Sequence, residues 1–426
     1  MKILIIGSGG REHAIGLALQ KSNKKPTLFF APGNAGTSTI GTNIPISDTA
    51  LDSLLQYAQS HSIELTIVGP ETPLVLGITD LFLEHNLAII GPNKEAAQLE
   101  GSKEWAKNLM KKHHIPTAAF EVFTTFKNAK HYIQSRSTYP IVIKADGLAA
   151  GKGVTIAHSE NEAIQALEEC FLDKKFKDSG LKVVIEDFLQ GDEASIFAFT
   201  DSHTFLSMLP AQDHKAINDG DTGPNTGGMG AYCPTPLISE TLKKRVDDEI
   251  FAPLLEAFKK ESIVYKGILY AGLMIAKDGT PSIVEFNARF GDPETQVVLP
   301  LLETDLLDIF NAIHTETLNH HQLKWSSNSA VCVVLAAEGY PNSYNKGMAI
   351  QGLDYQNPNI TLIHAGTSKK DGQTVTSGGR VLGVVSQAAS LDAAIDNAYT
   401  AIPNVSFDSI YYRKDIGQKA KRYITN

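Results

Sequence analysis

The chain has 426 residues, of which 42% are hydrophobic and 20% charged, a composition typical of a globular protein with a substantial core. At about 150 residues per domain, this length predicts about three domains. The formal net charge of −9 argues against a broad nucleic-acid surface, which needs an excess of Lys and Arg. The cysteines are scattered, without disulfide or zinc spacing, and no apolar run approaches a membrane span. We therefore expect a cytoplasmic protein without nucleic-acid or membrane partners.

The N-terminal region alternates between apolar strands and helices. Strands are predicted over residues 2–6, 27–31, 65–68 and 88–92, and helices around residues 14–19 and 51–60. This alternation predicts a doubly wound parallel sheet over residues 1–101. In such sheets ligands bind beyond the carboxyl ends of the strands, where the Gly- and Pro-rich turns of this chain fall.

The first of these turns, Gly7-Ser8-Gly9-Gly10-Arg11-Glu12, is similar to a dinucleotide-binding fingerprint. NAD is not favoured, because the fingerprint ends in Glu12 and the second strand ends in Ala31-Pro32-Gly33 without a ribose-binding carboxylate. Free N–H groups at a helix start still favour a phosphate. Two interpretations stay open: a phosphorylated small substrate binds here, or the glycines serve only tight packing.

A glycine-rich hairpin is predicted over residues 140–156. Two β-branched runs flank the loop, with Lys144 at the end of the first run and Lys152 inside the loop, which suits the binding of a polyphosphate. The spacing is one residue short of a P-loop, and Gly153 stands where Ser or Thr would hold Mg²⁺. A lid over ATP and an ordinary glycine-rich hairpin are about equally supported by this segment alone.

The central region predicts an α+β domain over residues 102–325, with a lid subdomain at about 121–190. Helices are expected over residues 102–113, 161–174 and 239–260, a strand over 182–186, and two antiparallel strands within 194–209. A long loop rich in Gly, Asp and Asn is predicted over residues 213–232, and its length suggests a function. It contains Asp213, His214 and Lys215, of which His214 is better explained as structural. Short strands and turns predict a β-rich domain over residues 326–426.

A hairpin of residues 270–276 and 282–287 carries the second strong signal. Alternation along the strand puts Glu285, Asn287 and Arg289 on one face and directs Val284, Phe286 and Ala288 into the core. Carboxylate and amide oxygens suit Mg²⁺, and a guanidinium suits a carboxylate or a phosphoryl group. The alternative is a solvated polar face. We favour a functional site, because this face leads directly into an acidic, glycine-containing turn.

Together these segments resemble the ATP-grasp ligases, and within them the phosphoribosylamine–glycine ligase family. The segments that carry the resemblance occur in family order, at residues 7–14, 69–71, 144–154, 212–232, 285–296, 339–341 and 378–383. The resemblance implies an N-terminal Rossmann-like substrate domain, an ATP-grasp domain with a mobile lid, and a small β-rich C-terminal domain. It further implies that ATP, glycine and 5-phosphoribosylamine give glycinamide ribonucleotide, ADP and phosphate through a glycyl phosphate, in de novo purine biosynthesis.

The resemblance also implies roles for individual residues. ATP would be bound by Lys103, Lys144, Gly151, Lys152, Gly153, Glu186, Leu189 and Glu193. Mg²⁺, with Mn²⁺ as an alternative, would be held by Glu285 and Asn287. The two ends of glycine would be bound by Asp213 and Arg289, which with Lys144 form the expected catalytic set, and the sugar phosphate by Gly9, Gly10 and Glu71. We expect a monomer.

Two positions depart from the pattern of related ligases. Residues 270–276 carry no further metal-binding carboxylate, unlike a two-metal site, and Ala216 stands where a basic residue is often found. Two rival functions are kept: an ATP-grasp carboxylase acting on a biotin carrier or a phosphoribosyl intermediate, and a nucleotide-binding regulatory module without turnover. The ligase interpretation requires the lysine hairpin and the acidic strand to meet around one magnesium nucleotide.

Overall fold

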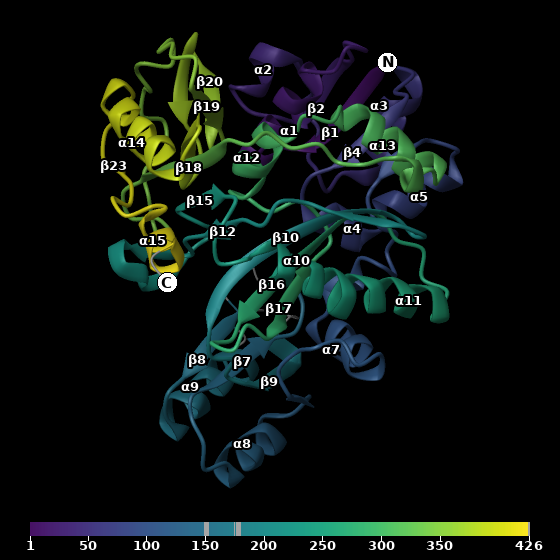
Figure 1. The fold of residues 1–426 in the computed structure, drawn as a ribbon, viewed down its shortest axis with the longest axis vertical. Coiled ribbons are helices and arrows are strands. Elements are labelled where there is room, and N and C mark those ends of the chain that lie inside the picture. Colours follow the sequence, from purple (N-terminus) through teal and green to yellow (C-terminus); the bar gives the residue numbers. More distant parts are fainter. Residues whose placement is uncertain (149–152, 174, 176–179, 425–426) are drawn as a thin grey trace.

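The N-terminal region is built on a five-stranded parallel sheet in the order β3-β2-β1-β4-β5 (Figure 1). The structure, a computed structural model, describes residues 1–148, 153–173, 175 and 180–424. The strands are β1 (Lys2–Gly7), β2 (Thr27–Pro32), β3 (Thr42–Asn43), β4 (Leu65–Val68) and β5 (Ile89–Ile90). The helices are α1 (Gly10–Gln20), α2 (Thr37–Ile40), α3 (Leu51–Ser60), α4 (Glu71–Leu76), α5 (Ile78–Glu84) and α6 (Gln98–Gly101). The central strand β1 is buried on both faces, which confirms the predicted doubly wound sheet.

The central region contains an antiparallel sheet in the order β11-β10-β16-β17. Its strands are β10 (Asp192–Asp201), β11 (Phe205–Ser207), β16 (Lys266–Ile275) and β17 (Pro281–Asn287). The helices of this region are α7 (Lys103–Lys112), α10 (Glu240–Val246) and α11 (Ala252–Lys260). A π-helical turn, Asp247–Phe251, joins α10 to α11 just before Pro253, which has no N–H to donate to the preceding turn. The helix expected over residues 239–260 is therefore present, with a local widening.

The lid unit is a four-stranded sheet with two helices, and it projects from the rest of the chain in Figure 1. Its elements are β6 (Phe120–Phe123), α8 (Phe126–Ser135), β7 (Ile141–Ala145), β8 (Val154–Ala157), α9 (Glu160–Phe171) and β9 (Val183–Asp187). It has a hydrophobic core of its own, including Ile133, Ile143 and Leu167. The predicted hairpin is present as the antiparallel pair β7–β8. A separate core is what a moving lid requires, and the movement itself stays a prediction.

The prediction of a loop over residues 213–232 is wrong, because this segment contains four short strands. They are β12 (Gln212–Asp213), β13 (Ala216–Asn218), β14 (Thr222–Asn225) and β15 (Gly230–Cys233). β13 pairs with β14, whereas β15 pairs with β18 (Ser329–Ala337), far away in the sequence. Strands this short depend on their partners for stability, so the local pattern does not reveal them.

The C-terminal region is organised by a sheet in the order β12-β15-β18-β22-β19, with β23 also paired to β18. Its remaining strands are β19 (Ile360–His364), β20 (Thr367–Lys370), β21 (Gln373–Thr376), β22 (Arg380–Ala388) and β23 (Ile410–Tyr411). The helices α12 (Thr295–Val298), α13 (Leu306–Thr315), α14 (Leu391–Ala401) and α15 (Lys421–Ile424) complete the fold, with 3₁₀ turns at Asp219–Asp221, Leu299–Leu301, Leu318–His320, Ile402–Asn404 and Gln418–Ala420. This sheet joins strands from both sides of the predicted boundary at residue 325, so the central and C-terminal regions share a core element.

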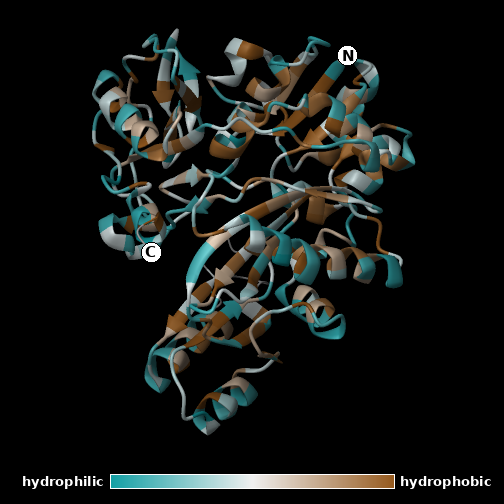
Figure 2. Ribbon diagram, viewed as in Figure 1, coloured by the Kyte–Doolittle hydropathy of each residue, from teal (hydrophilic) through white to brown (hydrophobic). Residues whose placement is uncertain are grey.

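Hydrophobic residues follow the strands and the inner sides of the helices, while exposed turns are hydrophilic (Figure 2). Two large cores span neighbouring regions, because residues of the N-terminal sheet and of β10 and β16 belong to the same clusters. No helix within the described part of the chain is long and apolar enough to cross a membrane. The extended packing fixes the N-terminal sheet against the β10–β16–β17 sheet, and this contact positions the residues described next.

Candidate active site

Lys144 connects the lid unit to the acidic strand. It lies at the end of β7, and its Nζ donates to the carbonyl oxygen of Val284 on β17 at 3.0 Å. The same Nζ lies 3.0 Å from a carboxylate oxygen of Glu186 on β9. The lysine hairpin and the acidic strand are thus in direct contact, as expected from the sequence.

A β-bulge in β17 exposes the carbonyl group that Lys144 binds. Gly272 pairs with Glu285 and Leu273 pairs with Ile283, so Val284 has no partner in the ladder. Ile283 is fully buried in the core, whereas Val284 is only partly buried. The prediction that Val284 points into the core is therefore wrong, because the bulge interrupts the alternation on which it rested.

Three lysines, here called the lysine cluster, gather on this side of β17: Lys103, Lys107 and Lys144. Lys107 lies 3.0 Å from Glu186, and Lys103 donates to the carbonyl oxygen of Gly147 at 3.1 Å. Burial lowers the pKa of Lys107 to about 8, with Glu186 opposing and Lys144 adding to the effect. Burial also lowers the pKa of Lys103, which Glu285 opposes. Two buried lysines and one partly buried lysine, with only partial compensation of their charges, suit a polyphosphate.

Glu285 keeps its charge although it is partly buried. Burial alone would raise its pKa, but the fields of Lys215, Lys144 and Lys103 outweigh it and lower the pKa. Asn287 is nearly buried beside it, and its Oδ1 accepts a hydrogen bond from Arg289 at 3.2 Å. Among the residues described, no group of three or more His, Cys, Asp or Glu side chains could hold a metal ion. A single carboxylate with one amide oxygen still suits Mg²⁺, which often takes most of its ligands from water and phosphate.

Arg289 joins the central region to the N-terminal region. Its Nη2 donates to Glu100 at 2.7 Å, and its Nε donates to Glu71 at 3.2 Å. The other oxygen of Glu100 accepts the backbone N–H of Ala288 at 2.7 Å. Burial raises the pKa of Glu100 to about 7, with Arg289 opposing. The guanidinium is therefore held in one orientation by two carboxylates from the N-terminal region.

Lys215 and Asp213, from the segment 213–221, form a second charged group that interacts with Glu285 through Lys215. Lys215 donates to Glu193 on β10 at 2.7 Å. Glu193 and Asp213 raise the pKa of Lys215 well above its usual value, although burial acts in the other direction. Burial raises the pKa of Asp213, which Lys215 opposes and Glu294 reinforces. The electrostatic link between Lys215 and Glu285 makes this group continuous with the lysine cluster.

The first turn is closed by the protein's own carboxylates. The N–H of Gly9 donates to Glu12 at 2.5 Å, and the N–H of Arg11 donates to Asp292 at 3.4 Å. A Cβ on Gly69 would lie 2.0 Å from Glu12, so the neighbouring glycines leave room for this buried side chain. The N–H of Gly9 is therefore held by Glu12 within the protein, while phosphate binding at this turn stays a prediction.

The comparisons with known proteins agree along the whole chain. Residues 1–100, 101–295 and 330–419 match the models of phosphoribosylglycinamide synthetase N, ATP-grasp (A) and C domains, respectively. A phosphoribosylamine–glycine ligase of Halalkalibacterium halodurans is 48% identical over 420 residues, covering 99% of this chain and 97% of the relative. The chain belongs to the phosphoribosylamine–glycine ligase family. The ATP-grasp fold, the three-domain architecture and the ligase activity in purine biosynthesis expected from the sequence are thereby confirmed.

Solved structures support the same conclusion. The phosphoribosylamine–glycine ligase of Thermotoga maritima has a TM-score of 0.84 at 37% identity, covering 97% of this chain and all of that one (100%). The biotin carboxylase domain of Hydrogenobacter thermophilus 2-oxoglutarate carboxylase, in complex with MgADP and bicarbonate, has a TM-score of 0.73 at 15% identity, covering 96% and 91%. At this identity the second likeness shows the shared fold alone.

In this member of the phosphoribosylamine–glycine ligase family, most of the expected site residues interact with one another. The contacts and fields described above link Lys103, Lys144, Glu186, Glu285, Asn287, Arg289, Glu71, Asp213 and Glu193. Leu189 is partly buried in the connection between β9 and β10, and the carbonyl of Gly153 accepts the N–H of Ala145 at 2.8 Å. Gly151 and Lys152 lie outside the described residues. Gly9 and Gly10 lie on a neighbouring face, where a Cβ on Gly10 would lie 2.6 Å from the amide of Gln296.

A cavity of about 390 Å³ opens beside Gly9. Its lining brings together the first two N-terminal turns and three C-terminal segments, through Ser8, Asn34, Tyr340, Thr367 and Arg380 among others. Three of these segments carried the family resemblance in the sequence. Arg380 donates to the carbonyl oxygen of Asp292 at 2.6 Å, on the segment that follows Arg289. The cavity and the Arg289 site are therefore neighbours along one stretch of chain.

Sequence reasoning missed Lys107, Glu100 and Lys215 as members of the site. Lys107 follows Lys103 by four residues on α7, and this helical spacing is a signal that could have found it. Lys215 stood in a segment already singled out, but its pairing with Glu193 depends on tertiary structure. Glu100 offered no local signal, because its partner Arg289 lies 189 positions away.

Proposed function

We propose that this site activates glycine with ATP and then transfers the glycyl group to 5-phosphoribosylamine. A glycine carboxylate oxygen attacks the γ-phosphorus and ADP leaves. The amine nitrogen of the sugar phosphate then attacks the acyl carbon, and inorganic phosphate leaves, giving glycinamide ribonucleotide. The contact between Lys144 and the Val284 carbonyl carries the proposal, because it brings the cations of the lid to the acidic strand.

The lysine cluster would bind the phosphates of ATP. Lys107 and Lys144 share one carboxylate, Glu186, and Lys103 binds a carbonyl oxygen, so phosphate oxygens would complete their compensation. Gly151, Lys152 and Gly153 would cover the phosphates from the lid. Glu186 on β9, Leu189 in the connection that follows and Glu193 on β10 would hold adenine and ribose. Catalysis would come mainly from position and charge neutralisation.

Mg²⁺, or Mn²⁺ in its place, would be held by Glu285 and Asn287. When bound, the ion neutralises charge on the transferring phosphoryl group. The lowered pKa of Glu285 supports this assignment, because an ionised carboxylate is ready to take a cation at neutral pH. Arg289 shares the Asn287 oxygen and would orient the reacting carboxylate beside the metal site.

Glycine and the sugar phosphate would be bound on either side of Arg289. Arg289 would hold the glycine carboxylate and Asp213 the ammonium group, with Lys215 balancing the negative charge. Glu71 would contact the sugar. The phosphate end would enter the cavity beside Gly9 and Gly10, where Arg380 supplies positive charge in place of the Gly9 N–H that Glu12 occupies.

Oxygen labelling with substrate omission tests this proposal. With ¹⁸O in the glycine carboxylate, one labelled oxygen should appear in the released inorganic phosphate, and only when ATP and 5-phosphoribosylamine are also present. Retention of all label in the product would contradict the acyl phosphate. ADP release with bicarbonate in place of glycine would favour the carboxylase, and ATP binding without any release would favour the regulatory module.

We further propose that the enzyme is a cytoplasmic monomer. Cys170, Cys233 and Cys332 are free and buried, as suits a reducing compartment. The large exposed hydrophobic side chains lie on separate elements, including α4, α5 and β8. Sedimentation equilibrium should give the mass of one chain, 46.1 kDa, and a mass of twice this value would contradict the monomer.

A further inference from the structure

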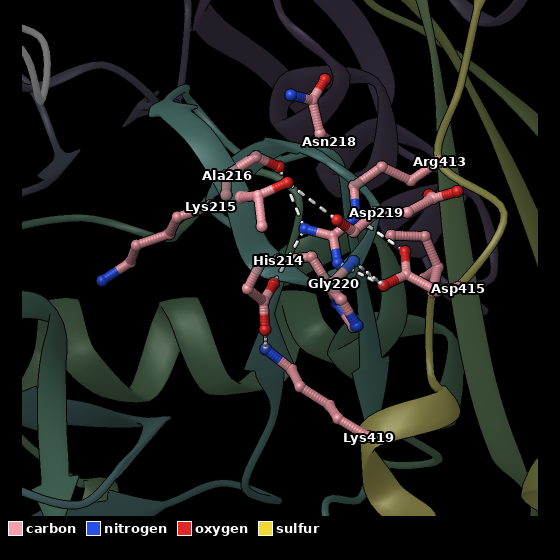
Figure 3. Close-up of polar contacts among 12 residues, drawn as sticks. His214, Lys215, Ala216, Asn218, Asp219, Gly220, Arg413, Asp415 and Lys419 are labelled. Atoms are coloured by element: carbon pink, nitrogen blue, oxygen red, sulfur yellow. Dashed lines mark hydrogen bonds and ion pairs between the residues drawn. The ribbon is translucent and has the colours of Figure 1, made fainter.

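The C-terminal segment 411–419 holds the segment 213–221 through a network of buried polar contacts (Figure 3). Its centre is Arg413, whose side chain is 0% exposed. Arg413 donates from Nη1 to the carbonyl oxygen of Ala216 at 3.0 Å and to Asp221 at 2.8 Å. Its Nε and Nη2 bind the two oxygens of Asp415 at 2.8 and 2.7 Å. Each of the three guanidinium nitrogens thus donates to at least one partner.

Other residues of the C-terminal segment continue the same contacts along the chain. Lys419 donates to the carbonyl oxygen of Asp213 at 2.6 Å, and the N–H of Gly417 donates to the His214 ring at 3.3 Å. Tyr411 donates to the carbonyl oxygen of Ile217 at 2.9 Å. Asp415 accepts the N–H of Gly220 at 2.8 Å.

The backbone carbonyl groups from 213 to 217 are all held. The C-terminal segment binds those of Asp213, Ala216 and Ile217, while the N–H groups of Met229 and Thr226 bind those of His214 and Lys215 at 2.8 Å. The segment 213–217 therefore has its path fixed at each residue, although its own strands are only two or three residues long. Side chains of the C-terminal segment thus hold three of these carbonyl groups, in addition to the short ladders of β12 with β15 and of β13 with β14.

Lys215 points away from the network in Figure 3, toward Glu193. It thus faces the active site, while Arg413 holds the carbonyl group of Ala216 after it and Lys419 holds that of Asp213, two residues before it. Burial and Lys419 keep the pKa of His214 well below its usual value, so this ring stays neutral between Lys215 and the C-terminal segment. The orientation of Lys215 and Asp213 is consequently set by residues more than 190 positions later in the chain.

We propose that Arg413, Asp415 and Lys419 are positioning residues for the ligase reaction, which hold Asp213 and Lys215 at the active site without touching substrate. This inference rests on the roles proposed above for Asp213 and Lys215. Accurate positioning of Asp213 and Lys215 matters for the reaction, because displacement of a reacting or binding group by about 1 Å can cost about 100-fold in rate. Arg is suited to the task, because a planar fork can bind a carbonyl and two carboxylates at once and a lysine cannot.

Replacement Arg413→Lys tests the inference, with Arg245→Lys as the matched control. Arg245 also binds a carboxylate, Glu249, and a carbonyl, that of Gly279, but on the surface of α10. We expect Arg413→Lys to lower kcat/KM for glycine by about 100-fold with the fold intact by circular dichroism, and the control to stay within about twofold. Normal glycine kinetics in folded Arg413→Lys would overturn the proposal.

A double-mutant cycle with Lys215→Ala separates positioning from general stability. If Arg413 acts through Lys215, the double variant should be no slower than Lys215→Ala alone. Independent, multiplying losses would contradict the proposal. Should Arg413→Lys fail to fold, Lys419→Met removes the bond to the Asp213 carbonyl and the ion pair with Asp221 and should still raise the KM for glycine, whereas an unchanged KM would overturn the inference. Full activity of Asp213→Asn and Lys215→Ala would instead refute the roles proposed for those two residues.

Discussion

Arg289 has partners from three elements in one small volume. Glu71 and Glu100 come from the N-terminal region, and Asn287 comes from β17. The residue types of this site could be predicted from the sequence, since Glu285, Asn287 and Arg289 stood at alternate positions of one strand. The carboxylates that orient Arg289 could not, because nothing near Glu100 in the sequence marks it as a partner.

Replacement of Glu285 by Gln should abolish most metal-dependent turnover. The change keeps the shape of the side chain but removes the only negative charge that the lysine fields stabilise at this position. We expect kcat to fall by about 100-fold or more, because the group acts where charge develops in the reaction. Steady-state ADP production measures it, with Glu249→Gln in the π-helical turn that follows α10 as the control. Unchanged turnover would remove Glu285 from the metal site.

Replacement of Arg289 by Lys should weaken glycine binding. A lysine cannot reproduce the separate bonds that Arg289 makes to Glu71 and Glu100 while presenting a fork to a carboxylate. The KM for glycine should rise by about tenfold or more, since a charge-assisted hydrogen bond contributes about 1.5–3 kcal/mol. Glycine saturation curves at fixed ATP measure this change. A variant that saturates with glycine like the wild type would contradict the assignment.

Glu100 should make stability depend on pH between about 4.5 and about 7. Burial raises its pKa from 4.5 to about 7 in the folded protein, so the folded state holds this proton more tightly than the unfolded state. The stabilising contribution of the protonated Glu100 carboxyl group is therefore complete below the pKa that the group has in the unfolded chain. It is lost as the pH rises through the pKa of the folded state. Urea unfolding of wild type and Glu100→Gln should show the wild type losing up to about 1.4 kcal/mol per pH unit relative to the variant. A difference that is constant from pH 5 to 8 would contradict the shift.

At the scale of elements, long apolar strands were predictable and partner-dependent ones were not. The buried strands β1 and β4 and the β16–β17 hairpin follow directly from local pattern. The four strands between residues 212 and 233 escaped prediction, because they are only two to four residues long and β15 also pairs with the distant β18. The bulge at Val284 likewise escaped, since alternation alone assumes an unbroken ladder.

The lid unit should respond to loss of its core without disturbing the N-terminal sheet. Leu167 is fully buried among residues of the lid unit alone, so Leu167→Ala should cost about 2–5 kcal/mol there. Hydrogen exchange should accelerate in β7 and β9 while β1 and β4 remain protected, and the KM for ATP should rise. Equal acceleration in all regions would show that the lid unit has no independent stability.

At the scale of the whole molecule, the active site is assembled from every region of the chain. The N-terminal region orients Arg289, the lid unit brings Lys144, β17 supplies Glu285, and the C-terminal segment fixes the path of residues 213–221. Family order of short motifs was enough to predict three domains and their chemistry. It could not show that the sheet containing β12 and β15 extends into the C-terminal region, because sheet pairing is decided by tertiary packing.

The position of a bound metal nucleotide is the decisive observation. Crystals grown with ADP and Mn²⁺ allow the ion to be located by its anomalous scattering. We expect one Mn²⁺ peak beside Glu285 and Asn287, with the phosphates of the nucleotide against Lys103 and Lys144. A nucleotide bound elsewhere, or an ion that leaves Glu285 without a contact, would contradict the proposed site.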